Sequence, residues 1–209
     1  MKNYSYLLIA FLFSAGMMAQ DRGSVVLDVY GSYVFSDRIN FDYGHATIGD
    51  GFEYGGGLEF FPQKSSSVEL KYLRLDTSMP AYNNAGLQQN PGDDKGAINY
   101  IFLGGNHYFD NGNNAVPYVG GSIGMAIVET PQQGSSTNFA WEIKGGVKIK
   151  TASIVSISLQ AFLQSMVINT GTDTYWGYWG PVAVDTYTNS FQFGLGAVVG
   201  FNFKHNNSL

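Results

Sequence analysis

The chain has 209 residues, of which only 13% are charged, whereas charged residues usually make up about 25% of a soluble domain. Glycine is frequent, with 27 residues, or roughly twice its usual share of about 7%. There is no cysteine, which excludes a disulfide framework, a thiolate metal site, a cysteine nucleophile and lipid attachment through cysteine. No internal apolar run approaches the length of about 18 residues that a membrane-spanning helix needs, so a helical membrane protein is excluded.

The first segment has the pattern of a secretory signal peptide. Lys2 precedes the apolar run of residues 6–13, and small residues follow up to Ala19. This run is too short to span a membrane, so we predict a signal peptide at residues 1–19 that is cleaved after Ala19. The remaining residues, 20–209, carry 16 acidic and 10 basic residues, a net charge of −6. That charge provides no basic surface for nucleic acid.

The rest of the chain alternates apolar and polar residues with a period of two, and no sustained helical period of 3.6 residues occurs. The pattern predicts an all-β protein with eight strands. They are expected near residues 24–36, 51–61, 67–76, 97–109, 116–128, 138–150, 154–167 and 190–203. Strands of about ten residues are long for an ordinary sheet but suit a tilted strand that crosses a bilayer.

The last predicted strand shows the alternation most clearly. Its apolar face consists of Phe191, Phe193, Leu195, Ala197, Val199, Phe201 and Phe203. Aromatic rings therefore stand at both ends of this face and aliphatic side chains in the middle. Lipid-facing strands have this arrangement because rings prefer the two headgroup interfaces, whereas a soluble core gives no reason for it.

The connections between the predicted strands alternate in length. Long loops are expected at residues 37–50, 77–96 and 168–189, a moderate one at 129–137, and short turns at 62–66, 110–115 and 151–153. One end of the protein should therefore have tight turns and the other end large loops. Outer-membrane barrels have this asymmetry, with short periplasmic turns and longer external loops.

Three stretches carry a resemblance to a known family: YGGGLEFFP at residues 54–62, PYVGGSIG at 117–124 and VGFNF at 199–203. With them, the chain resembles the small outer-membrane β-barrels of the OmpA and OmpX type, porin-like barrels of bacteria with two membranes. The resemblance covers nearly all of residues 22–203. It implies an eight-stranded antiparallel transmembrane up-and-down β-barrel in contact with outer-membrane lipid. It also implies insertion by the outer-membrane assembly machinery, which would read the aromatic end of the last strand, here Phe201 and Phe203.

The face opposite the lipid would point into the barrel lumen. We expect eight charged residues there: Asp28, Glu53, Glu59, Glu69, Lys71, Glu142, Lys144 and Lys148. They could form a proton or ion path, but a plug of mutually paired charges is favoured because an unpaired buried charge is costly. Eight strands enclose an interior just wide enough for side chains to fill, so no wide pore is expected. Leu73 and Leu75 fall on the same face, which we attribute to the upper part of that strand lying outside the membrane.

The last long loop contains the repeat YWGYWG at residues 175–180. Exposed rings beside glycines can stack on sugars or enter a partner's pocket. Tyr175, Trp176, Tyr178 and Trp179 are therefore the candidate binding residues for an extracellular protein or glycan. They could equally belong to the outer aromatic girdle or to a hairpin that extends beyond the membrane.

No catalytic, metal or cofactor site is expected. The three histidines, His45, His107 and His205, show no serine and acid partners in a nucleophilic arrangement. The sequence thus favours a structural or binding role through extracellular loops. A narrow porin-like channel is the first alternative and a lipid-modifying enzyme the second. A soluble secreted barrel that holds an apolar ligand would have the same period with its faces exchanged.

Overall fold

The computed structural model describes residues 24–41, 44–92, 94–109, 113–130, 134–151, 154–177 and 180–203, with the backbone alone described for residue 41 and residues 169–186. The predicted signal peptide at residues 1–19 lies outside these ranges. Within them, no helix is long and apolar enough to cross a membrane.

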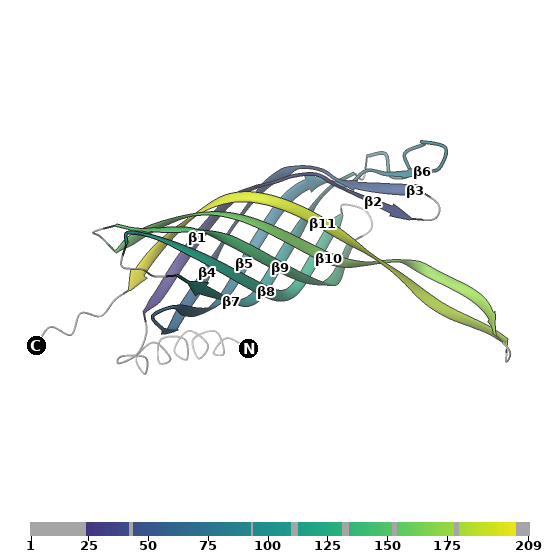
Figure 1. The fold of residues 1–209 in the computed structure, drawn as a ribbon. Coiled ribbons are helices and arrows are strands. Elements are labelled where there is room, and N and C mark those ends of the chain that lie inside the picture. The colour runs from purple at the N-terminus through teal and green to yellow at the C-terminus, as the bar shows by residue number, and fades with distance from the viewer. Residues whose placement is uncertain are drawn as a thin grey trace, which may run out of the picture.

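Eight long strands close into one barrel (Figure 1). They are β1 (Val25–Val34), β4 (Gly51–Gln63), β5 (Ser66–Ser78), β7 (Lys95–Tyr108), β8 (Ala115–Thr130), β9 (Gly134–Lys150), β10 (Val155–Gly177) and β11 (Gly180–Phe203). Every neighbouring pair is antiparallel. The predicted all-β fold with an eight-stranded antiparallel barrel is confirmed, and each predicted strand overlaps one observed strand.

The first and last strands close the barrel. β1 pairs with β11 from Val25 opposite Phe203 to Val34 opposite Gly194, and its other edge pairs with β4. Both edges of β1 are therefore hydrogen-bonded, which a spanning sheet requires because lipid offers no partner for free backbone groups.

Two of the predicted long loops form a small second sheet. β2 (Asp37–Phe41) and β3 (Gly44–Ile48) make a hairpin, and β6 (Ala81–Asn83) adds to β3. The prediction of loops at 37–50 and 77–96 was therefore partly wrong. These strands are short and lie at the loop end beyond the barrel body (Figure 1), where no lipid imposes the long apolar alternation by which the other strands were found.

The loops predicted at residues 129–137 and 168–189 are also shorter in the structure. β8 continues to Thr130 and β9 begins at Gly134, so most of 129–137 is strand. The segment 168–189 is largely a continuation of β10 and β11, which stay paired as far as Gly177 opposite Gly180. The backbones of these strands stay paired beyond the residues whose side chains alternate between apolar and polar.

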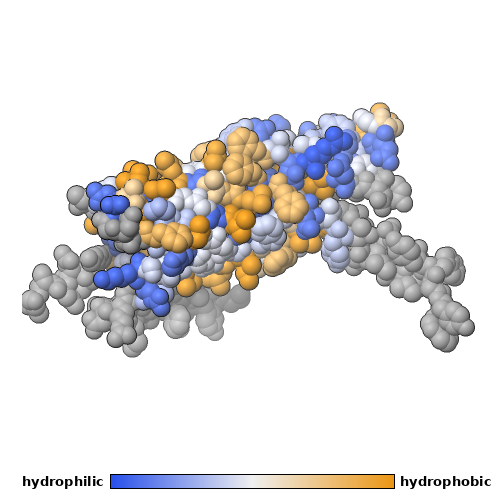
Figure 2. Space-filling view, in the orientation of Figure 1, coloured by the Kyte–Doolittle hydropathy of each residue, from blue (hydrophilic) through white to orange (hydrophobic). Residues whose placement is uncertain are grey.

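The barrel surface is apolar on the outside. On β1, for example, Val29 is 49% exposed whereas Tyr30 next to it is 4% exposed. Apolar side chains gather over the middle of the visible barrel surface, and hydrophilic ones toward the loop end (Figure 2). Soluble monomers rarely expose a continuous apolar area of more than a few hundred Å². This outer surface is therefore suited to lipid.

The inner face changes character along the barrel. From the tight-turn end of β5 toward its loop end, the inner residues are Ser67, Glu69, Lys71, Leu73 and Leu75, all buried. The two leucines thus lie inside the barrel, on the face that the sequence assigned to the lumen. They belong to an apolar cluster toward the loop end. Its buried members are Tyr30, Val34, Ile39, Ile48, Leu73, Leu75, Ile98, Tyr100, Phe102, Ala126, Ala140, Phe162, Met166 and Val198.

The lipid-facing surface gives a direct test. Leu159 lies opposite Ala197, in the middle of the apolar face of β11, and is 58% exposed. We expect Leu159→Arg to destabilise the barrel in lipid vesicles by about 2–4 kcal/mol, because a charge near the bilayer centre loses its hydration. Urea unfolding, read from the heat-modifiable gel migration of folded barrels, would measure this.

Leu87 provides the matched control. It is 64% exposed but lies between β6 and β7, away from the barrel wall. Leu87→Arg should change stability by about 0.5 kcal/mol or less, as surface substitutions usually do. Equal effects of the two substitutions, or folding of the wild type in plain buffer, would contradict a lipid-facing surface.

Candidate functional site

The structure places all eight predicted lumen charges inside the barrel, none more than 9% exposed. They come from four strands: Asp28 from β1, Glu53 and Glu59 from β4, Glu69 and Lys71 from β5, and Glu142, Lys144 and Lys148 from β9. In the barrel order, β9 lies on the side opposite β4 and β5. Charges from opposite walls therefore meet in the lumen.

Three ion pairs cross the lumen. Lys71 Nζ lies 2.7 Å from both oxygens of Glu142. Lys144 Nζ lies 2.8 Å from Glu69 Oε1. Lys148 Nζ lies 3.0 Å from Glu59 Oε2. Each lysine thus pairs with a glutamate of the opposite wall, which ties β9 to β4 and β5.

Neutral side chains donate further hydrogen bonds to the glutamates of two of these pairs. Glu59 Oε1 accepts hydrogen bonds from Asn106 Nδ2 at 2.8 Å and from Tyr108 OH at 2.6 Å, besides Ser67 Oγ at 2.5 Å. Glu69 Oε1 accepts one from Tyr30 OH at 2.7 Å. Our reading of the sequence did not name these four donors. The available signal was their position in the strand alternation, because each stands at an inward-facing position of its own strand, as the charged residues do.

Two lumen carboxylates have no cationic partner. Five acids face three lysines, and each lysine has its closest contact with a different glutamate, so Asp28 and Glu53 are left over. Glu53 accepts a hydrogen bond from Gln164 Nε2 at 3.0 Å, but its Oε1 has no partner among the described residues. For Asp28, the described side chains provide no hydrogen bond or ion pair at all. With every carboxyl counted as ionised, the eight lumen residues have a formal charge of −2.

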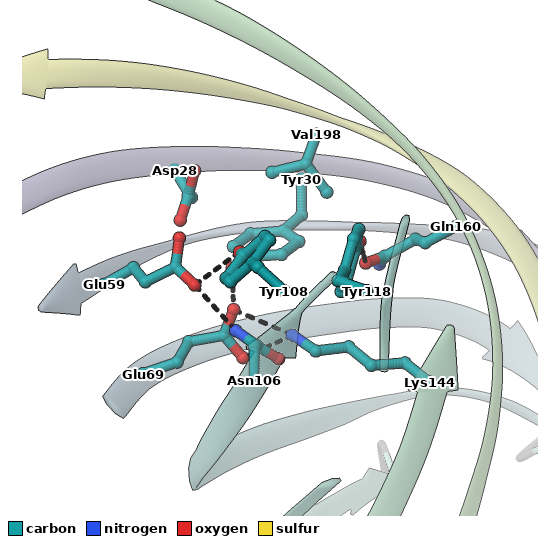
Figure 3. Close-up of a pocket in the computed structure, with 10 residues that line it drawn as sticks. All are labelled: Asp28, Tyr30, Glu59, Glu69, Asn106, Tyr108, Tyr118, Lys144, Gln160 and Val198. Carbon is teal, nitrogen blue, oxygen red and sulfur yellow. Dashed lines mark hydrogen bonds and ion pairs between the residues drawn. The ribbon is translucent and has the colours of Figure 1, made fainter. Parts of the chain in front are cut away.

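A small polar cavity lies within this network (Figure 3). Its volume of about 10 Å³ is room for one water molecule. Asp28, Glu59 and Glu69 line it together with Asn106 and Lys144. Among the described residues, no group of three or more histidine, cysteine, aspartate or glutamate side chains is arranged to hold a metal ion.

Two of the four candidate binding residues of the last loop, Tyr175 and Trp176, fall on the extension of β10. Tyr178 and Trp179 lie outside the described residues. The backbones of Tyr175 and Trp176 pair with those of Val182 and Pro181. The structure therefore places these two positions near the tip of a two-stranded ribbon rather than in an irregular loop.

The two histidines within the described residues occupy different settings. The His45 ring stacks on Tyr82 in the small sheet, with 5.2 Å between ring centroids. His107 Nδ1 lies 3.2 Å from Ser66 Oγ on the outer surface near the tight turns, a contact that sequence reasoning missed because 41 residues separate the two. No described carboxylate is within hydrogen-bond distance of this ring, so the acid that orients a nucleophilic pair is not present there. His205 lies outside the described residues.

The proposed assembly signal ends the described chain. β11 finishes at Phe203, which is 61% exposed, and Phe201 is partly exposed. Both lie on the outer face of the strand, opposite Val25 and Leu27 of β1. Their aromatic rings thus lie at the tight-turn end of the apolar surface.

Comparison with solved structures identifies the fold. Neisserial surface protein A matches with a TM-score of 0.55 at 16% identity, over 87% of this chain and 97% of that one. The outer membrane protein OprG from Pseudomonas aeruginosa matches with a TM-score of 0.55 at 12% identity, over 88% and 97% of the two chains. The fold is that of a small outer-membrane β-barrel.

A third structure agrees with this assignment. The outer membrane protein AlkL, solved in lipid bilayers, matches the chain with a TM-score of 0.52 at 14% identity, over 90% of this chain and 93% of that one. No family model matches the sequence, and no curated protein does. The likeness therefore lies in the architecture of a small outer-membrane barrel, and the individual site must be argued from this chain's own residues.

The ion pairs predict a strong effect of removing one partner. Lys71→Met leaves Glu142 buried without its cation, which should destabilise the barrel by about 3–5 kcal/mol. Adding Glu142→Gln should recover most of this loss, because the unpaired charge disappears. Urea unfolding in vesicles would measure both variants.

Arg74 is the control for this test. Its Nε lies 2.9 Å from Asp76 Oδ1, but the pair is substantially exposed. Arg74→Met should therefore cost about 1 kcal/mol or less. If Lys71→Met were as mild as Arg74→Met, or if the double variant were no more stable than Lys71→Met, the ion pairs would not hold the lumen together.

Proposed function

We propose that the protein is an integral outer-membrane protein that presents the extension of β10 and β11 to an extracellular partner and carries out no catalysis. One observation carries this proposal. Pairing of β10 with β9 ends at Met166 opposite Ala140, whereas pairing with β11 continues to Gly177 opposite Gly180. A two-stranded ribbon, which we call the external ribbon (residues 169–188), therefore projects beyond the barrel wall (Figure 1).

The external ribbon is costly to hold in one conformation. Two-stranded ribbons are marginally stable in water on their own, and ordering each residue costs about 1–2 kcal/mol of conformational entropy. A rigid barrel at its base supports it, since β10 and β11 are both paired on both sides inside the wall. The design suits a binding element held at a distance from the membrane.

The composition of the ribbon tip supports a binding role. Tyr175, Trp176, Tyr178 and Trp179 stand within the stretch of residues 175–180, which also contains two glycines. Tyrosine and tryptophan supply large contact areas at little entropic cost and are frequent at binding hot spots. A protein pocket or the face of a sugar ring is the matching partner.

The apolar outer surface and the chain termini support the location. The exposed apolar side chains of the barrel wall match a lipid environment. The predicted signal peptide at residues 1–19 would direct export. Phe201 and Phe203 at the end of β11 would serve recognition by the outer-membrane assembly machinery.

A narrow channel is the second candidate, favoured by the lumen charges. The interior side chains weigh against a permanently open path. Three ion pairs cross the lumen, and the apolar cluster lies toward the loop end, where Ile39 of β2 and Ile48 of β3 join it. Ions passing through this cluster would lose their hydration, which is costly.

The ribbon can be tested by substitution. Replacing Tyr175, Trp176, Tyr178 and Trp179 with serine should leave heat-modifiable folding unchanged, because the backbones of Tyr175 and Trp176 pair beyond the barrel wall. Binding to a glycan array or to host-cell surface protein should fall by about tenfold or more, as loss of several aromatic anchors usually gives.

Replacement of Leu87 with serine, another exposed apolar residue at the loop end, is the control and should retain binding. If the four-serine variant misfolds, the rings have a structural role. If it binds as tightly as the wild type does, the ribbon tip is not the binding element.

Planar bilayers separate the two candidate functions. The wild type should show no persistent conductance steps, because side chains fill the lumen. Phe102→Ala, which removes one ring of the stacked pair Tyr100–Phe102, should make brief openings more frequent while heat-modifiable migration persists. Stable, ohmic steps from the wild type would favour the channel.

A further inference from the structure

The unpartnered Asp28 side chain lies at the small cavity described above. Asp28 is 4% exposed, and its carboxylate points toward that of Glu59 (Figure 3). No described side chain donates a hydrogen bond to it or pairs with it. A buried carboxylate without a partner is strongly unfavourable, so the site calls for a positive charge from elsewhere.

A second oxygen at the same cavity also lacks a partner. Asn106 lines the cavity and is 5% exposed. Its Nδ2 donates to Glu59 Oε1, whereas its Oδ1 is buried without a hydrogen bond among the described residues. Buried acceptors normally have a donor or a cation. The described residues around the cavity thus include two groups without a donor, the Asp28 carboxylate and Asn106 Oδ1.

The nearby lysines form their ion pairs with glutamates and not with Asp28. Lys148 is engaged by Glu59 and Lys144 by Glu69, so the two nearby ammonium groups already have glutamate partners. Tyr30, Tyr108 and Tyr118 also line the cavity, and their hydroxyls donate to Glu69, Glu59 and Gln160. The cavity therefore combines one excess negative charge with several oxygen atoms, the ligand type that hard cations prefer.

The size of the cavity restricts the occupant. It has room for about one particle of the size of water. Mg²⁺ usually keeps several waters, and Ca²⁺ takes six to eight oxygen ligands that generally include several carboxylates. Here only Asp28 is free, because the Glu59 and Glu69 carboxylates are already bonded. We propose that the lumen binds one monovalent cation, Na⁺, between Asp28 and the cavity oxygens.

Cation linkage in the folded state provides the test. Wild-type protein in zwitterionic phosphatidylcholine vesicles would be unfolded with urea at constant pH and constant ionic strength while Na⁺ replaces N-methylglucamine⁺. A cation that binds only the folded state lowers the unfolding equilibrium constant by the factor 1 + [Na⁺]/Kd. We expect a fall of about tenfold when Na⁺ rises from about 1 mM to a concentration about ten times its Kd.

Two isosteric variants locate the site. Asp28→Asn should abolish the dependence on Na⁺, because the excess charge at the cavity is removed. Glu53→Gln is the matched control: it removes the other carboxylate without a cationic partner, which does not line the cavity, and should leave the dependence on Na⁺ intact. Equilibrium dialysis of the wild type against radioactive Na⁺ should give one bound ion per chain, and it needs no variant to fold.

Each of three results would overturn the proposal. The first is stability of the wild type that is the same in Na⁺ and N-methylglucamine⁺, with no Na⁺ retained in dialysis. The second is dependence on Na⁺ that persists in Asp28→Asn, which places the ion elsewhere. The third is stability that responds to pH but not to the identity of the cation, which assigns a proton to Asp28 instead of Na⁺.

Discussion

Closure of β1 against β11 is the constraint on which the rest of the structure depends. In lipid, a free sheet edge would leave a row of backbone groups without partners, each costing several kcal/mol. The pairing of Val25 with Phe203 and of Val34 with Gly194 removes that edge. It also fixes the register around the whole barrel, because each strand is hydrogen-bonded to two neighbours. A shift by one residue would exchange the lipid-facing and lumen-facing sides.

The register in turn decides which charges meet. Lys71 reaches Glu142, Lys144 reaches Glu69, and Lys148 reaches Glu59, all between walls that are not adjacent in the barrel order. Buried ion pairs add little net stability compared with well-packed apolar residues, but a broken pair is strongly destabilising. The pairs therefore act against wrong registers, in which lysines and glutamates of opposite walls would miss one another.

Much of this architecture could be predicted from the sequence, for a physical reason. A strand that faces lipid on one side must alternate strictly, so the faces of β1 and β11 follow from residue order alone. Cross-lumen partners could not be predicted, because they depend on barrel shear and on side-chain reach. The change on β5, where Leu73 and Leu75 follow Glu69 and Lys71 on the inner face, was visible in the sequence, but the apolar cluster inside the barrel that accommodates the leucines was not predicted. The small sheet was missed, and the external ribbon was foreseen only as the alternative of a hairpin beyond the membrane, because outside lipid no alternation marks these strands.

The limited space inside eight strands also shapes β11. A side chain at Gly194 would collide with the Phe162 ring, since a Cβ there would lie 2.3 Å from its Cζ. A Cβ at Gly196 would lie 2.2 Å from Ser32 Oγ. Phe162 and Ser32 on the neighbouring strands thus fit inside the barrel only because β11 contributes glycine at these levels. An interior filled in this way gives a stiff wall with no wide passage. The segment free of this packing constraint is the one that leaves the wall, where β10 and β11 continue together beyond their other neighbours.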